Sequence, residues 1–97
     1  MSLNTLLKKE KTIDEDTTKE FMIEISDALL YLQNNFIAHR DIKPPNILLL
    51  DNSIKLTDFG LACYFNNNTN MTSMCGSPLY MAPEIVNDDK GYNSKID

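Results

Sequence analysis

Glycine is scarce in this 97-residue sequence, and tryptophan is absent. The three glycines, Gly60, Gly76 and Gly91, lie too far apart to form a G-x-G-x-x-G segment. Such a segment lets the backbone approach phosphate groups closely, because glycine has no side chain. The sequence therefore contains no glycine-rich loop that could cover phosphates.

Cysteine and histidine are also rare, and their spacing argues against a metal site of the zinc type. Cys63 and Cys75 are twelve residues apart and form no C-x-x-C pair, and His39 is the only histidine. Zinc sites need several such ligands at short, defined spacings. We expect two reduced thiols, as in a cytoplasmic protein.

Basic residues are outnumbered by acidic ones, nine to fourteen, which leaves a net charge of -5. Binding to nucleic-acid phosphates needs a basic face, so no nucleic-acid partner is expected. The apolar run 47–50 is far shorter than the roughly 20 residues of a membrane span, and the N-terminus has no apolar core of signal-peptide length. These features predict a soluble cytoplasmic protein of one domain at most, without a membrane span.

The best-supported element is an amphipathic helix in the first third of the chain. Thr17 and Glu20 fit a capping box at its start, and Asn34-Asn35 would end it. Its apolar face is predicted from residues spaced by threes and fours, namely Phe21, Ile25, Ala28, Leu29, Leu32 and Phe36. We interpret this face as core packing.

A short β-hairpin is predicted after this helix. Residues 47–50 are apolar, residues 51–53 form a polar turn, and residues 54–57 alternate between apolar and polar. The hairpin then has Asn46 at its entry and Asp58 at its exit. Both side chains could therefore face the same metal ion.

Three short motifs occur in a fixed order around this hairpin. They are His39-Arg40-Asp41 with Asn46 after four intervening residues, Asp58-Phe59-Gly60, and Ala82-Pro83-Glu84. Each triplet alone is common by chance, but the order and the spacing together are specific. Phosphoryl transfer needs a carboxylate to orient the attacking hydroxyl and oxygen ligands to hold magnesium beside the phosphates.

On these motifs the sequence resembles the eukaryotic serine/threonine protein kinases over nearly its whole length. The resemblance implies an α+β fold, a part of the kinase C-lobe with an amphipathic helix, the catalytic loop, a short hairpin and the activation segment, without the N-lobe. Residues 1–97 would form a partial kinase domain that stops before the αF helix, with Asp97 as the first Asp of its lead-in. The run 75–81, C-G-S-P-L-Y-M, is especially similar to the autophagy-initiating kinases.

The resemblance assigns the chemistry to four residues. Asp41 would be the catalytic base for a Ser or Thr hydroxyl of a protein substrate. Lys43 would neutralise charge on the transferred phosphoryl group, and a lysine at this position is the serine/threonine-kinase form of the loop. Asn46 and Asp58 would hold Mg²⁺, and together with Lys43 they would bind ATP. The implied cofactors are therefore ATP and Mg²⁺.

Four other residues would support this site. Ser77 would hydrogen-bond toward Asp41 and Lys43 and favour Ser/Thr substrates, and Glu84 would pair with an arginine that the 97 residues do not include. His39 would be structural and would pack near Phe59, which would itself point inward.

Arg40 would pair with a phosphate on the activation segment between Phe59 and Pro83. Ser73 is the best-placed acceptor for that phosphate, and Thr69 and Thr72 are the other candidates. An unmodified loop serine at position 73 is the alternative.

Several parts of a kinase have no counterpart in the sequence. Besides the glycine-rich loop, no V-A-I-K lysine and no partnering helix glutamate can be identified. Phosphoryl transfer depends on positioning, so we expect the chain alone to be inactive and marginally folded, with a missing lobe or a partner chain required. A kinase-derived binding or regulatory module and a nonfunctional remnant remain as alternatives, although a pure binding module has no need for all four chemical residues.

Overall fold

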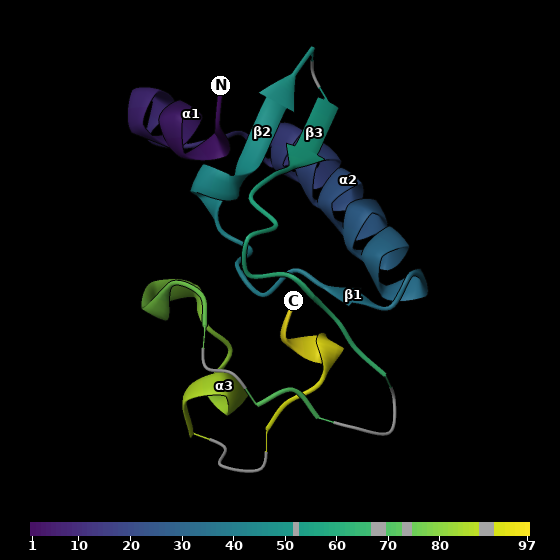
Figure 1. Ribbon diagram of the computed structural model, residues 1–97. Helices are drawn as coiled ribbons and strands as arrows, with labels where there is room; N and C mark the ends of the chain where they lie inside the picture. Colours follow the sequence, from purple (N-terminus) through teal and green to yellow (C-terminus); the bar gives the residue numbers. More distant parts are fainter. Residues whose placement is uncertain (52, 67–69, 73–74, 88–90) are drawn as a thin grey trace.

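The computed structural model describes residues 1–51, 53–66, 70–72, 75–87 and 91–97. Helices α1 (Leu3–Glu10) and α2 (Glu15–Asn34) lie beside a hairpin of β2 (Ile47–Leu50) and β3 (Ser53–Leu56) (Figure 1). Below this layer β1 (Ile37–Ala38) pairs with β4 (Cys63–Tyr64).

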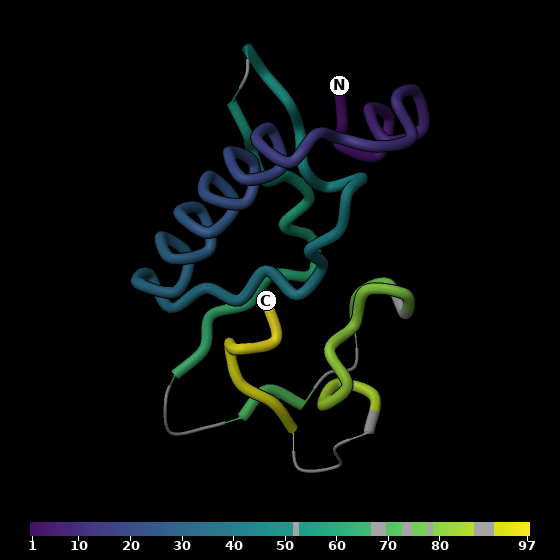
Figure 2. Tube along the Cα trace, turned by 180° about the vertical axis from the view of Figure 1, so that it is seen from behind, coloured from purple at the N-terminus to yellow at the C-terminus, as the bar shows by residue number. Residues whose placement is uncertain are grey.

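The C-terminal part of the chain lies on the other side of β1 from the hairpin. It contains α3 (Pro83–Asn87) and a short 3-10 helix, Ser94–Ile96, after which the chain ends close to the β1 region (Figure 2). The expected α+β architecture of a C-lobe segment is confirmed.

The two helices begin at polar caps that the sequence supplies locally. Ser2 Oγ accepts a hydrogen bond from Thr5 N at 3.1 Å, and Asp14 Oδ1 accepts one from Thr17 N at 2.8 Å. Each bond satisfies a backbone N–H that the first helical turn would otherwise leave without a partner. The prediction of a capping box at Thr17 was wrong, because Asp14 caps α2 and Thr17 already lies inside the helix.

Helix α2 ends at Asn34 as predicted, and its buried residues, Ile25 and Leu32, come from the predicted apolar face. Phe36 does not belong to that face. It follows the helix with a φ of 58°, is exposed, and its ring lies 5.9 Å from that of Phe65. A left-handed residue directly after a helix turns the chain away, so the side chain leaves the helical stripe.

The second strand of the hairpin begins and ends one residue earlier than predicted. The two strands are antiparallel, with Ile47 opposite Leu56 and Leu50 opposite Ser53. Ile25 of α2 packs with Ile47 and Ile54 of the hairpin to form the core, and other apolar side chains pack against these three: Leu3, Phe21, Leu29, Leu49 and Leu56. This small core fixes the hairpin, and thereby the residues at its open end.

A second contact ties the C-terminal segment to the activation segment. Met71 and Tyr92 form an isolated antiparallel bridge, with backbone N–O distances of 2.7 and 2.8 Å. Among the described residues, no helix combines the length and the apolar character needed to cross a membrane.

Candidate active site

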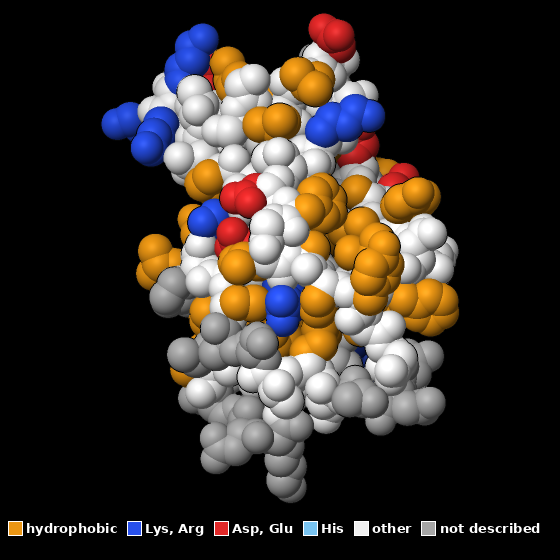
Figure 3. Space-filling view, viewed as in Figure 1, with side chains coloured by type: hydrophobic (Ala, Val, Ile, Leu, Met, Phe, Trp, Pro, Cys, Tyr) orange, Lys and Arg blue, Asp and Glu red, His pale blue; other side chains and the backbone are white. Residues whose placement is uncertain are grey.

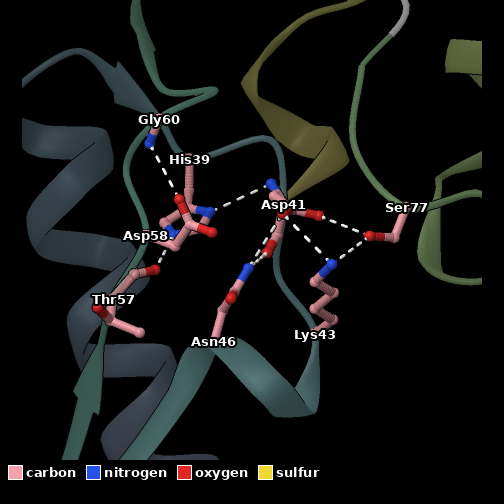
Figure 4. A network of polar contacts seen from close by, with 8 residues as sticks. All are labelled: His39, Asp41, Lys43, Asn46, Thr57, Asp58, Gly60 and Ser77. Atoms are coloured by element: carbon pink, nitrogen blue, oxygen red, sulfur yellow. Dashed lines mark hydrogen bonds and ion pairs between the residues drawn. The ribbon is translucent and has the colours of Figure 1, made fainter.

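The predicted catalytic loop runs from the end of β1 into the hairpin. Ala38 closes β1, and a 3-10 turn at Pro44–Asn46 leads directly into β2. The loop buries three polar side chains, since His39 is 0%, Asp41 9% and Asn46 6% exposed. Polar groups are buried at this density only where each has hydrogen-bond partners, and Figure 4 shows those partners converging on Asp41.

Asn46 is held against Asp41 by two hydrogen bonds. Its Nδ2 donates to the Asp41 backbone oxygen at 2.8 Å and to Asp41 Oδ2 at 3.1 Å. Both acceptors are oxygens, so the amide nitrogen must face them, and the orientation of the amide is fixed. The amide oxygen of Asn46 is therefore the atom that can face a cation.

Lys43 and Ser77 complete the surroundings of the Asp41 carboxylate. Ser77 Oγ donates to Asp41 Oδ1 at 3.1 Å, and Lys43 Nζ lies 3.6 Å from Asp41 Oδ2. Lys43 Nζ also donates to Ser77 Oγ. Ser77, which lies 34 and 36 residues after Lys43 and Asp41, thus forms one closed set of contacts with them.

His39 supports the loop from within. Asp41 N donates to His39 Nδ1 at 3.1 Å, and His39 Nε2 lies 2.9 Å from the Thr57 carbonyl oxygen. A backbone N–H can only donate and a carbonyl can only accept, so the ring carries its proton on Nε2. With both nitrogens engaged in this way, His39 has no lone pair to offer a substrate, which confirms the structural role predicted for it.

Phe59 is a partial exception to the predictions. Its ring lies 4.8 Å from that of His39 in an edge-on arrangement, as expected. Its side chain is nevertheless 45% exposed, so the expectation that it points into a closed core was wrong.

Asn46 comes directly before the hairpin and Asp58 shortly after it, as predicted, so both lie at its open end. Thr57 N donates to the Asn46 backbone oxygen at 2.9 Å, which places the exit of the hairpin beside its entry. Asp58 has a φ of 60° and an exposed side chain, and its Oδ1 accepts a bond from Gly60 N at 3.4 Å. No cluster of three or more His, Cys, Asp or Glu side chains suited to a metal occurs in the described part of the chain.

Asp97 supports the catalytic loop, a role that the motifs did not predict. Its Oδ2 accepts a hydrogen bond from His39 N at 2.7 Å, and its Oδ1 accepts one from Arg40 N at 2.9 Å. The catalytic loop is thus held by a carboxylate nearly sixty residues away. The only signal in the sequence was the similarity of residues 92–97 to the lead-in of an αF helix.

Gly76 brings the activation segment against the catalytic loop. Its φ is +103°, and a Cβ at this position would lie 2.7 Å from the Arg40 carbonyl oxygen. Only glycine accepts both this backbone conformation and this close approach. The next residue, Ser77, is thereby delivered to Asp41.

The side chain of Arg40 is hydrogen-bonded to two other segments of the chain. Its Nε donates to the Leu61 carbonyl oxygen at 2.7 Å and its Nη1 to Tyr92 Oη at 3.3 Å. Burial lowers the pKa of Arg40, but the bond with Tyr92 and the neighbouring thiols of Cys63 and Cys75 raise it, and the net shift is upward. Ser73, the predicted phosphate acceptor, lies outside the described residues, as does Thr69.

Glu84 lies in the first turn of α3 and is half-buried. Among the described residues it forms no ion pair, so the predicted pairing with an arginine outside these 97 residues stays a prediction.

A buried aspartate bracketed by a lysine, an asparagine and a serine from the activation segment is the arrangement of a protein kinase catalytic loop. The protein kinase domain family matches the chain over residues 1–97. The chain belongs to this family, and the relatives that it matches are serine/threonine protein kinases.

Three of these relatives show how far the similarity extends. The chain is 40% identical to serine/threonine-protein kinase unc-51 of Caenorhabditis elegans over 94% of its length, and 40% identical to serine/threonine-protein kinase ATG1b of Arabidopsis thaliana over 98%. Both are autophagy-initiating kinases, which confirms the narrower resemblance. Identity to the probable serine/threonine-protein kinase fhkE of Dictyostelium discoideum is 47% over 81% of the chain. The chain spans only 12%, 14% and 12% of the lengths of unc-51, ATG1b and fhkE respectively.

Proposed function

We propose that this chain carries the phosphotransfer centre of a serine/threonine protein kinase, which moves the γ-phosphoryl group of ATP to a Ser or Thr hydroxyl of a protein. The observation that carries the proposal is the set of contacts around Asp41, in which Lys43, Asn46 and Ser77 all meet one buried carboxylate. Family membership supports the reaction class, because protein kinases generally use ATP and Mg²⁺.

Asp41 is the proposed base. The hydroxyl oxygen of the substrate would form a bond to the γ-phosphorus while the bond from that phosphorus to the bridging oxygen of ADP breaks. The hydroxyl proton would pass to a carboxylate oxygen of Asp41. The carboxylate is held in position for this role, because Asn46 donates a hydrogen bond to Oδ2 and Ser77 donates one to Oδ1.

Lys43 is the proposed electrostatic stabiliser. Its ammonium group lies within 3.6 Å of Asp41, so it would sit beside the phosphoryl group as that group approaches the base. A cation fixed in place before the reaction lowers the energy of negative charge that develops on the phosphoryl oxygens.

Asn46 and Asp58 are the proposed Mg²⁺ ligands. The amide oxygen and the carboxylate are the hard oxygen donors that Mg²⁺ prefers, and phosphate oxygens and water would complete its shell. The orientation of Asn46, with its nitrogen committed to Asp41, fits this role. Bound Mg²⁺ would neutralise and orient the phosphates of ATP.

Ser77 supports a Ser/Thr rather than a Tyr substrate. Its hydroxyl donates to Asp41 Oδ1 and accepts a hydrogen bond from Lys43, so it holds the base and the cation together, as the serine/threonine form of the site requires. We further propose that the 97-residue chain alone transfers phosphate very slowly, since it contains no glycine-rich loop to cover the phosphates.

A chimera tests the proposal, with residues 1–97 replacing the aligned segment of unc-51, to which the chain is 40% identical. We expect the chimera to transfer phosphate from Mg·ATP to protein serine or threonine, detected as phosphoserine and phosphothreonine in the product. Asp58→Asn should raise the Mg²⁺ concentration needed for the half-maximal rate, whereas Asp51→Asn, in the hairpin turn, should not. A folded chimera that binds Mg·ATP but labels no protein would contradict the proposal.

A non-catalytic binding module is the second candidate, and one observation favours it. Four large apolar side chains of α2 are more than half exposed: Met22, Ile23, Leu30 and Tyr31. Hydrophobic side chains also gather on the right-hand part of the face shown in Figure 3. Exposed apolar patches mark contact surfaces. This candidate predicts that the folded parent chimera transfers no phosphate. It also predicts that the Asp41→Asn chimera still binds its protein partner.

A further inference from the structure

Arg40 has a strained backbone that neighbouring residues must hold. Its φ of 69° lies in the left-handed region, which residues other than glycine rarely adopt. Such a conformation persists only where the surrounding structure determines it. Asp97 supplies that support for the backbone, through its bond from Arg40 N.

The side chain of Arg40 is held by two different segments. Its Nε donates to the Leu61 carbonyl oxygen, and its Nη1 donates to the hydroxyl of Tyr92. Tyr92 is only 4% exposed, and a buried tyrosine hydroxyl needs a hydrogen-bond partner. The Tyr92 ring is therefore fixed with its hydroxyl directed at the guanidinium group.

Tyr92 is in turn anchored to the activation segment. Its backbone exchanges two hydrogen bonds with Met71, and the preceding Gly91, at φ +88°, would place a Cβ 2.6 Å from the Met71 carbonyl oxygen. Cys75 Sγ lies 4.0 Å from the Tyr92 hydroxyl. Tyr92 thus connects the activation segment, the segment before the C-terminus and the catalytic loop.

We propose that Tyr92 is a positioning residue for phosphoryl transfer, whose hydroxyl holds the Arg40 side chain, and through it the backbone of Asp41, in the absence of an activation-segment phosphate. The proposal rests on the proposed kinase function. Within the described part of the chain, Nη2 of Arg40 makes no further hydrogen bond, so it can still receive an anion. Tyr92 therefore contributes most to the rate while the activation segment is unphosphorylated.

The contact itself is tested in the 97-residue chain by NMR titration of tyrosines labelled with ¹³C at the ring carbon that bears the hydroxyl. Burial raises the pKa of Tyr92, while the bond and the charge of Arg40 lower it, and the Cys75 thiol faces the same hydroxyl. We expect the pKa of Tyr92 to lie above the ordinary value of a tyrosine, and Arg40→Met to raise it further. An ordinary tyrosine pKa for Tyr92, or no response to Arg40→Met in a folded chain, would overturn the contact.

The role in catalysis is tested in the unc-51 chimera, which also decides the question if the chain alone does not fold. Tyr92→Phe keeps the buried ring and removes only the hydroxyl, and Tyr64→Phe, at an exposed tyrosine of β4, is the matched control. For Tyr92→Phe we expect kcat to fall about tenfold with an unchanged KM for ATP, and no change for Tyr64→Phe. Equal kcat values in the two variants would refute the role of Tyr92. A parent chimera without activity would instead refute the proposed function, and the titration would then decide the Arg40 contact.

Discussion

Gly76 joins two parts of the site through a contact that allows no side chain. Its φ is +103°, and a Cβ at this position would lie 2.7 Å from the Arg40 carbonyl oxygen. An L-residue there would be strained in its backbone and would also push the activation segment away from the catalytic loop. The position of Ser77 at Asp41 therefore depends on the residue before it.

Replacing this glycine should cost stability. We expect Gly76→Ala to lower the free energy of unfolding by about 1–3 kcal/mol, from left-handed strain and steric overlap. Urea denaturation of the 97-residue chain measures this loss. Gly60→Ala is the matched control, because its Cβ would meet only the end of the Asp58 side chain, at 3.3 Å. Equal losses in both variants would show that the Gly76 contact is not tight.

Two residues with proposed roles have a backbone conformation that residues other than glycine rarely adopt. Arg40 and Asp58 both have positive φ values, 69° and 60°. Among the described residues, the other non-glycine examples are Lys11, Phe36 and Asp51, which directly follow helices or form the hairpin turn, where such values are common. Since Arg40 and Asp58 follow neither pattern, their conformations are maintained by the contacts of the site.

Among the secondary-structure elements, α2 depends on a charged cap. The backbone and side-chain hydrogen bonds from Thr17 lower the pKa of Asp14. A carboxyl whose pKa is lower in the folded state stabilises the fold above its unfolded pKa, near 4, and this contribution is lost as the pH falls through the folded value.

Removing the cap should therefore have an effect that depends on pH. Asp14→Ala should lower the urea midpoint at pH 7, and the difference from the parent chain should shrink as the pH falls below about 4. Circular dichroism at several pH values follows both proteins. Asp16→Ala, in the same helical turn but without a capping bond, is the control and should show a smaller difference at pH 7.

The C-terminal 3-10 helix matters because it presents Asp97 to the catalytic loop. Asp97→Ala would leave the N–H groups of His39 and Arg40 without their acceptor, which should cost about 2 kcal/mol. The rate of hydrogen exchange at these two amides should rise by the factor that corresponds to this loss of free energy. Lys95→Ala, an exposed residue of the same helix, should leave both exchange rates unchanged, and slow exchange in the Asp97 variant would contradict the role of Asp97.

At the scale of the whole molecule, the sequence predicted well what depends on neighbouring residues. The apolar spacing in α2 and the apolar–turn–apolar pattern of the hairpin are local signals, and both elements formed. The helix start was misplaced because Asp14 and Thr17 both fit a capping motif, and only the backbone path distinguishes them.

Contacts between distant segments were harder to predict. Asp97 meets His39, and Tyr92 meets Arg40, across more than fifty residues. No periodicity or local motif encodes such pairs, because they arise from how the C-terminal segment passes beneath β1. The motif residues Asp41, Asn46 and Ser77 could be named in advance, whereas the residues that support them required the fold.

The rate of phosphate transfer by the unc-51 chimera, with and without Asp41→Asn, tests the central claim most directly. Asparagine keeps the size of the side chain but cannot accept the substrate proton. Our account predicts that kcat falls by about 10²- to 10⁴-fold, with a KM for ATP that stays the same. An Asp41→Asn chimera that transfers phosphate as fast as its parent would contradict the account.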